Sequence, residues 1–410
     1  MPEFIKLLPP GEALSILMER ISAGAGCELI ETNAALGRVT NTSVLAPHPL
    51  PSFSRSTVDG FALQAKDTYG ASDSLPAYLK LIGEVPMGAT AGITVGNSQC
   101  ALIHTGGMLP LGTDAVVMIE HTQVARPGEV EILKSVAVGE NIIAVGEDIT
   151  AGDEVVPAGK ELREAEIGGL MALGITQLSV SKRPVVGILS SGDEVIPPQE
   201  SPLPGQVRDV NTYSLQALVN KHGGVSALYG IIPDTVDELR KKAVQALKEC
   251  DMVIITAGSS ASERDLTALV VNELGEPGML VHGVNVRPGK PTILAVCDNK
   301  VVIGLPGNPV SALVIAKLFV VPVLEKLLRL THKPPEPSIS AKLSINLSSQ
   351  TGREDWVPVR LRKVTDGYLA EPIFGKSNLI FILVRADGLI RIPPSATGLR
   401  AGENVEVVLM

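Results

Sequence analysis

Three acidic and two basic residues follow apolar, strand-like runs in the middle of the chain. Glu194, Asp234 and Asp265 lie at or just after such runs. Carboxylate oxygens are the ligands that Mg²⁺ prefers, so these side chains could hold a divalent ion. Arg287 and Lys290 flank a Pro-Gly pair. A planar guanidinium beside a compact ammonium is suited to bind an oxyanion.

Ordinary structural roles also explain several of these polar residues. Asp234 could cap the predicted helix that ends at Glu249, and Asn211 could cap the one that ends at His222. A single such side chain is more often a cap or solvated than catalytic. The functional interpretation depends on several of them meeting at one edge of one sheet.

Two polar segments earlier in the chain carry further candidates. Asp59 precedes Gly60 at the end of a constrained polar loop, and Thr105 opens a Thr-Gly-Gly turn that could present a hydroxyl and two amides. An Asp-Gly turn and an ordinary loop explain these segments as well. The local pattern therefore leaves both roles open.

The runs that must position the central candidates are short and rich in β-branched side chains. They span residues 184–189, 252–255, 284–286 and 301–305, and helical periodicity separates them. In open α/β sheets, ligands bind beyond the carboxyl ends of the strands, where Gly-rich turns and helix N-termini favour anions. The Walker and dinucleotide-binding motifs are absent. The GxSxG motif is absent too, which disfavours acyl-enzyme chemistry.

β-Rich segments flank this α/β region. Residues 76–145 and 338–410 alternate with a period of two, and a stiff Pro-rich linker at 333–337 precedes the second segment. The chain is therefore predicted to be an α/β multidomain protein with β-rich accessory domains.

Composition excludes several classes of partner. The net charge is −9 and aromatic residues make up only 3% of the chain, so neither nucleic acid nor a membrane is expected. Four scattered cysteines without a CxxC pair fit free thiols in a reducing cytoplasm. The apolar stretch at 310–330 contains charges and a proline, so we expect a buried helix.

Six motifs, taken in order, resemble the molybdopterin molybdenumtransferase family, which includes MoeA and the E domain of gephyrin. They are Ser56-x-x-Asp59-Gly60-Phe61-Ala62, Thr105-Gly106, Gly146-Glu147-Asp148-Ile149, Ser191-Gly192-Asp193-Glu194, Pro288-Gly289-Lys290-Pro291 and Leu305-Pro306-Gly307-Asn308-Pro309-Val310-Ser311. The resemblance covers essentially the whole chain.

The resemblance implies an enzyme that inserts molybdate into adenylylated molybdopterin, forms molybdenum cofactor and releases AMP with the help of Mg²⁺. It implies a cytoplasmic homodimer that works with molybdopterin adenylyltransferase and recipient molybdoenzymes. It also implies four domains. These are a lasso-like linker domain (27–46 and 147–178), a β-rich domain (47–146), a central adenylyltransferase-like α/β domain (6–26 and 179–330) and a C-terminal β-barrel (331–410).

The resemblance also implies roles for individual residues. The catalytic set is Asp59, Thr105, Glu194, Asp234 and Asp265, with Glu194 and Asp265 as metal ligands. The substrate- and molybdate-binding set is Arg287, Lys290, Pro291, Asn308, Ser311, Arg353 and Ser377.

Departures from the family pattern leave alternatives open. The hydroxyl pair expected shortly after Ser377 is replaced by Phe381-Ile382, and the usual Gly-Gly-Val-Ser loop is Gly258-Ser259-Ser260-Ala261-Ser262. A divergent paralogue that handles tungstate or acts at molybdopterin adenylylation is one alternative. A non-catalytic scaffold or binding protein is another.

Overall fold

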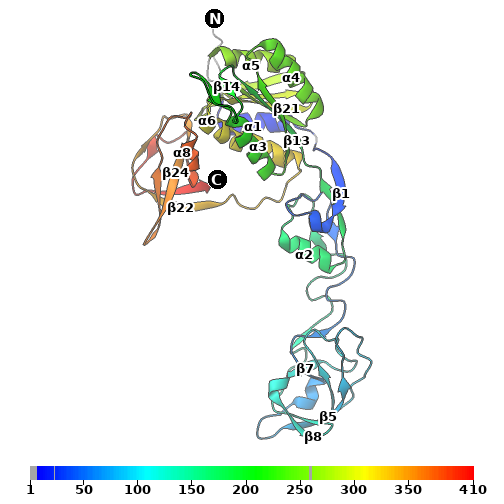
Figure 1. The fold of residues 1–410 in the computed structure, drawn as a ribbon. Coiled ribbons are helices and arrows are strands. Elements are labelled where there is room, and N and C mark those ends of the chain that lie inside the picture. The colour runs from blue at the N-terminus through cyan, green and yellow to red at the C-terminus, as the bar shows by residue number, and fades with distance from the viewer. Residues whose placement is uncertain (1–6, 23, 258–260) are drawn as a thin grey trace. The chain divides into compact units, whose positions relative to one another are not determined.

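The computed structural model describes residues 7–22, 24–257 and 261–410, and of residues 261–265 only the backbone. The chain forms two compact units (Figure 1). The larger unit comprises Met1–Thr42, Ala158–Arg163 and Gln177–Met410, and the smaller comprises Ser43–Pro157 and Glu164–Thr176. Each unit is described by itself.

A six-stranded sheet forms the centre of the larger unit. Its strands, in spatial order, are β16 (Val225–Ile232), β13 (Val185–Ser191), β17 (Met252–Ala257), β21 (Lys300–Pro306), β20 (Ile293–Cys297) and β18 (Pro277–His282). The first four are parallel, and β20 and β18 continue the sheet antiparallel. The predicted runs at 184–189, 252–255 and 301–305 are therefore neighbouring parallel strands.

Helices cover both faces of this sheet. They are α1 (Pro10–Glu19), α3 (Asn211–Lys221), α4 (Val236–Glu249), α5 (Ala261–Glu273), α6 (Pro309–Ile315), the π-helical turn η4 (Ala316–Val320) and α7 (Val321–Leu327). Along β17, Met252 and Ile254 pack on the side of α1, α3 and α6–α7, whereas Val253 and Ile255 pack on the side of α4 and α5. Because both faces are buried, the strand is apolar at four consecutive positions, from Met252 to Ile255.

The predicted run at 284–286 does not belong to this sheet. Only Val286–Arg287 is a strand, β19, and it pairs in parallel with β24 of the C-terminal domain. Periodicity cannot distinguish a central strand from a short edge strand that pairs with another domain. The pairing matters because it joins the central domain to the barrel.

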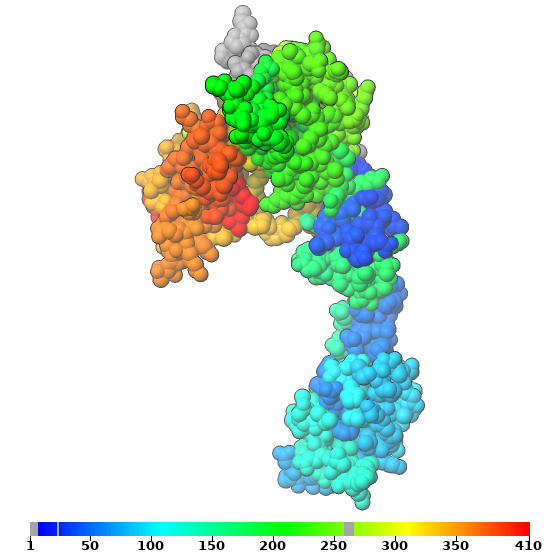
Figure 2. Space-filling view, in the orientation of Figure 1, coloured from blue at the N-terminus to red at the C-terminus, as the bar shows by residue number. Residues whose placement is uncertain are grey.

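The C-terminal domain is a closed barrel. Its strands are β22 (Ser338–Leu343), β24 (Glu354–Val364), β25 (Gly367–Pro372), β26 (Gly388–Ile392) and β28 (Asn404–Leu409). Because β24 pairs with both β25 and β26, the five strands form a ring. The additional elements are β23 (Leu347–Ser348), the short helix α8 (Phe381–Val384) and β27 (Gly398–Leu399). The predicted linker at 333–337 is exposed along its whole length (Figures 1 and 2).

The smaller unit contains a second six-stranded sheet. Its spatial order is β7 (Ala115–Met118), β4 (Gly60–Leu63), β6 (Gln99–Ile103), β5 (Ala77–Glu84), β9 (Glu129–Ile132) and β8 (Thr122–Arg126). Further short elements of this unit are β2 (Val44–Leu45), β3 (Arg55–Ser56), η2 (Ala65–Thr68), η3 (Ile119–His121), β10 (Ile142–Ile143), β11 (Glu154–Val156) and α2 (Glu164–Ala172). The prediction of an α/β protein with β-rich accessory parts and a terminal barrel is confirmed.

Paired strands also link distant parts of the N-terminal half. In the larger unit, β1 (Cys27–Glu31) pairs with β12 (Gln177–Ser181), and η1 (Thr32–Ala34) follows β1. In the smaller unit, β2 pairs with β11. Two-residue strands β14 (Val195–Ile196) and β15 (Val207–Arg208) follow β13. Among the described residues, no helix is both long and apolar enough to cross a membrane.

Candidate active site

One pocket of the larger unit gathers the predicted anion-binding residues. It has a volume of about 1020 Å³ and lies where the central domain meets the barrel. Seven of its lining residues form the whole predicted substrate-binding set: Arg287, Lys290, Pro291, Asn308, Ser311, Arg353 and Ser377. They come from four separate segments of the sequence, so the fold is what brings them together.

The central domain supplies the loop after β19 and the turn before α6. Gly289 has φ +114°, and a Cβ there would lie 2.3 Å from Ile315 of α6, so only glycine lets the loop pack this closely. Lys290 follows directly, and its carbonyl accepts the amides of Val284 and Thr292. The backbone that carries Lys290 is therefore fixed at the pocket wall.

The turn after β21 is held from two sides. The Asn211 side chain donates to the Gly307 carbonyl at 2.7 Å, and the Val310 amide donates to the Ser377 carbonyl at 3.0 Å. The predicted capping role of Asn211 is wrong, because Asn211 is the first residue of α3 and its Oδ1 accepts no hydrogen bond from the described residues. The bond to Ser377 ties the barrel to the first turn of α6.

The barrel supplies Arg353 through the pairing of β19 with β24. In this pairing Arg287 lies opposite Asp355. Asp355 is almost fully buried and accepts two hydrogen bonds from Arg353, at 2.6 Å to Nε and 2.9 Å to Nη2, and one from Ser349 Oγ at 3.0 Å. The carboxylate raises the pKa of Arg353 and fixes the plane of its guanidinium.

Asp355 was not predicted as a site residue, although it stands two positions after Arg353. We expect Asp355→Asn to raise the KM for the anionic substrate about tenfold, because the guanidinium loses its bidentate partner. The increase should be largely absent in an Arg353→Lys background. Glu371→Gln, which breaks a similar pair with Arg362 (2.7 Å) outside the pocket, is the control. Steady-state kinetics measure the KM of the two single variants, the double variant and the control. Equal effects of Asp355→Asn in the wild-type and Arg353→Lys backgrounds would show that Asp355 does not act through Arg353.

The charge of the pocket favours an anion. Of the described residues that line it, four are cationic, namely Arg287, Lys290, Arg353 and Lys376, and one is a carboxylate, Asp355. Hydroxyls and amides from Asn308, Ser311, Asn346, Ser348 and Ser377 add neutral hydrogen-bonding groups. The remaining wall is largely apolar and includes Trp356 and Phe374. Such a pocket can bind an oxyanion at one side and an uncharged ring at the other.

A separate polar cluster lies at the carboxyl ends of β13 and β16. Asp234 accepts hydrogen bonds from Ser191 Oγ and, at 3.3 Å, from the Asp193 amide, while Asp193 accepts the Asp234 amide at 3.2 Å. The predicted capping role of Asp234 is therefore wrong, since α4 has no side-chain cap. Glu194 is half-buried in the same turn.

The predicted metal ligands are only partly described. Asp265 lies in α5, which follows β17, and its side chain is outside the described residues, as is most of the Gly258–Ser262 loop. Among the side chains that the structure describes, no group of three or more His, Cys, Asp or Glu residues could hold a metal ion. Glu194 and Asp234 are hard oxygen donors of the type that suits Mg²⁺.

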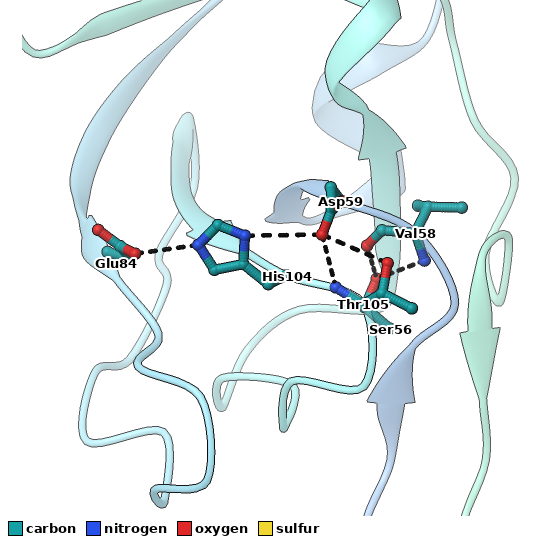
Figure 3. Close-up of polar contacts among 6 residues, drawn as sticks. All are labelled: Ser56, Val58, Asp59, Glu84, His104 and Thr105. Carbon is teal, nitrogen blue, oxygen red and sulfur yellow. Dashed lines mark hydrogen bonds and ion pairs between the residues drawn. The ribbon is translucent and has the colours of Figure 1, made fainter.

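Asp59 and Thr105 meet in the smaller unit (Figure 3). Asp59 Oδ1 accepts the Thr105 amide at 2.8 Å and the Thr105 hydroxyl at 3.3 Å, and the amide is the main reason that the pKa of Asp59 is lowered. They meet because β4, which follows Asp59, pairs antiparallel with β6, which precedes Thr105. Gly60 permits the approach of β7, since a Cβ there would lie 1.9 Å from the Val117 carbonyl oxygen.

Comparisons with known proteins agree with this arrangement. Three family models match successive parts of the chain: "MoeA N-terminal region (domain I and II)" over residues 8–174, "Probable molybdopterin binding domain" over 187–326 and "MoeA C-terminal region (domain IV)" over 340–410. A molybdopterin molybdenumtransferase of Nostoc is 30% identical over 96% of this chain and 91% of its own. A crystal structure of a molybdopterin biosynthesis MoeA protein from Pyrococcus horikoshii superimposes with a TM-score of 0.87, at 31% identity, over 99% of this chain and 100% of its own.

The chain belongs to the MoeA family. The family predicted from the six motifs is therefore confirmed.

The main departure from the MoeA pattern affects two positions in α8. Phe381 is 64% exposed, whereas Ile382 is buried, lines the pocket and packs in the core between the central domain and the barrel. The two positions are thus not equivalent. Only Ile382 occupies a place from which a hydroxyl could reach an anion in the pocket.

We expect Ile382→Thr to tighten molybdate binding roughly fivefold, because one hydrogen bond contributes about 1 kcal/mol. The same change should lower the free energy of unfolding by about 1–2 kcal/mol, since an ethyl group in the core is replaced by a buried hydroxyl. Phe381→Ser should change neither quantity by much. Calorimetry measures the affinity for molybdate, and urea denaturation measures the free energy of unfolding. Unchanged affinity in Ile382→Thr would mean that Ile382 only fills space.

Proposed function

We propose that this chain is a molybdopterin molybdenumtransferase, which inserts molybdate into adenylylated molybdopterin, forms molybdenum cofactor and releases AMP. The observation that carries the proposal is the cationic pocket lined by all seven residues of the predicted substrate-binding set. Full-length similarity to proteins that bear this name supports it.

Within the pocket, Lys290, Arg287 and Arg353 bind the dianionic molybdate. Ser311 and Ser377 donate hydroxyl hydrogen bonds to its oxygens. The apolar wall excludes water from one side of the site, which strengthens these charge-assisted hydrogen bonds. Asp355 keeps the guanidinium of Arg353 in place, so little side-chain freedom is lost when the anion binds.

The carboxylates at the sheet edge serve a different part of the substrate. Glu194 and Asp265 would hold Mg²⁺, which when bound would neutralise the charge of the substrate phosphate. Asp234, which accepts hydrogen bonds from Ser191 and Asp193, holds that turn in shape. Asp59, with one oxygen fixed by Thr105, serves as a charged catalytic group.

We further propose that the enzyme is a homodimer in which the Asp59–Thr105 pair of one subunit and the pocket of the other serve one substrate. Two-fold dimers are the commonest oligomers, and each compact unit carries only part of the residue set. The adenylylated substrate requires a preceding adenylyltransferase, and the product requires a recipient molybdoenzyme.

Reconstitution tests this function. Purified protein is incubated with adenylylated molybdopterin, Mg²⁺ and either molybdate or tungstate, while AMP release and activation of an apo-molybdoenzyme are followed. We expect AMP release and activation with molybdate. Activity with tungstate alone would favour the divergent paralogue, and AMP release with neither oxyanion would contradict the proposal.

A further inference from the structure

A histidine lies between two carboxylates at one end of the strands of the sheet in the smaller unit (Figure 3). His104 directly follows β6, which is flanked in the sheet by β4 and β5. β4 is antiparallel to β6 and begins just after Asp59, while β5 is parallel to β6 and ends at Glu84. This topology sets Asp59 on one side of His104 and Glu84 on the other.

Both ring nitrogens of His104 face a carboxylate oxygen. Nε2 lies 3.0 Å from Glu84 Oε1, and Nδ1 lies 3.5 Å from Asp59 Oδ1. A neutral imidazole can donate from only one nitrogen, whereas the imidazolium donates from both. The arrangement therefore fits the cationic ring. The Glu84 hydrogen bond is the largest cause that raises the pKa of His104, and Asp59 adds to it.

From this geometry we propose that His104 is a positioning residue for Asp59, holding the carboxylate through the ion pair at Nδ1 while Glu84 holds the ring through the hydrogen bond at Nε2. The proposal rests on the proposed function of Asp59. Oδ1 of Asp59 is then contacted by Thr105 and His104. Among the described residues, no group is bonded to Oδ2, which stays available to the substrate.

Deprotonation of the His104 ring should release the Asp59 carboxylate. The shorter contact, to Glu84, keeps the remaining proton on Nε2, so the lone pair of Nδ1 then faces Asp59 Oδ1 and repels it. Glu84 of β5 and Asp59 before β4 are the charged groups that act on the ring. Because the pKa of His104 is raised, the holding form persists above pH 6.5. Activity should fall as the pH rises through the pKa of His104.

The test combines pH profiles with NMR on the full-length protein. In the wild type, kcat for AMP release should fall with the same midpoint that the His104 ring shows in a ¹H–¹³C titration. His104→Gln should lose this alkaline limb and have a kcat reduced about fivefold at neutral pH. Glu84→Gln should move both midpoints to lower pH, because the carboxylate that most raises the pKa of His104 is lost. His121→Gln, a half-exposed histidine of the same unit, should leave the profile unchanged.

Two results would overturn the proposal: an alkaline limb that persists in His104→Gln, or a His104 midpoint that Asp59→Asn does not lower. Failure of the proposed function has a different signature, namely no AMP release by the wild type at any pH. In that case the NMR midpoints still decide whether His104 and Asp59 interact. Far-UV circular dichroism establishes that each variant is folded, as expected for partly exposed side chains.

Discussion

Replacing Lys290 by alanine should raise the KM for molybdate about tenfold to a hundredfold. A charge-assisted hydrogen bond to the anion is lost, and such a bond contributes roughly 1.5–3 kcal/mol. The value of kcat at saturating molybdate should change much less, because the remaining cations still orient the bound anion. Steady-state AMP release as a function of molybdate concentration measures both constants.

Lys241→Ala is the matched control for this experiment. Lys241 is an exposed lysine of α4 in the same domain, and it does not line the pocket. The variant removes the same charge from the protein. The position tolerates alanine well, since it lies in a helix. Equal KM values for Lys290→Ala and the wild type would remove Lys290 from the anion site.

The second large effect is expected from mixing two inactive variants. Asp59→Ala and Lys290→Ala should each be nearly inactive at a molybdate concentration well below the KM of the lysine variant. In a shared-site dimer, half of the randomly exchanged dimers are mixed, and each mixed dimer has one site with both residues intact. The mixture should therefore recover up to about a quarter of wild-type activity.

Subunit exchange must be shown independently, with a differently tagged copy of each variant. A mixture that exchanges subunits and remains inactive would place Asp59 and Lys290 in a site formed by one chain. Recovery without exchange would point to refolding or contamination. The shared-site model requires both exchange and recovery.

Local sequence patterns were enough for most of the central sheet, whereas most residues of the pocket were predicted from the family resemblance. The strands β13, β17 and β21 each contain an uninterrupted apolar run that is followed in the sequence by Gly, Asn or acidic residues, and this signal depends only on near neighbours. The motif around Asn308 follows such a run, because β21 belongs to the central sheet. The motif around Lys290 reaches the same pocket through β19, which pairs with the barrel and not with this sheet.

Contacts that depend on strand pairing were missed. Glu84 and His104 are 20 residues apart, and they meet only because β5 and β6 pair with an irregular register. The pairing of Val286 with Glu354 joins two domains through a strand too short to leave a periodic signal. Asp234 looked like a helix cap because sequence alone cannot show that Ser191 donates to it.

The most direct measurement is the position of molybdenum in crystals of this protein, located by anomalous scattering at a molybdate concentration close to its KM. We expect one peak in the pocket, within hydrogen-bonding distance of Lys290, Arg353 and Ser377, and we expect it to vanish in Lys290→Ala. A molybdenum peak elsewhere, with the pocket empty at the same concentration, would contradict the assignment of this pocket as the molybdate site.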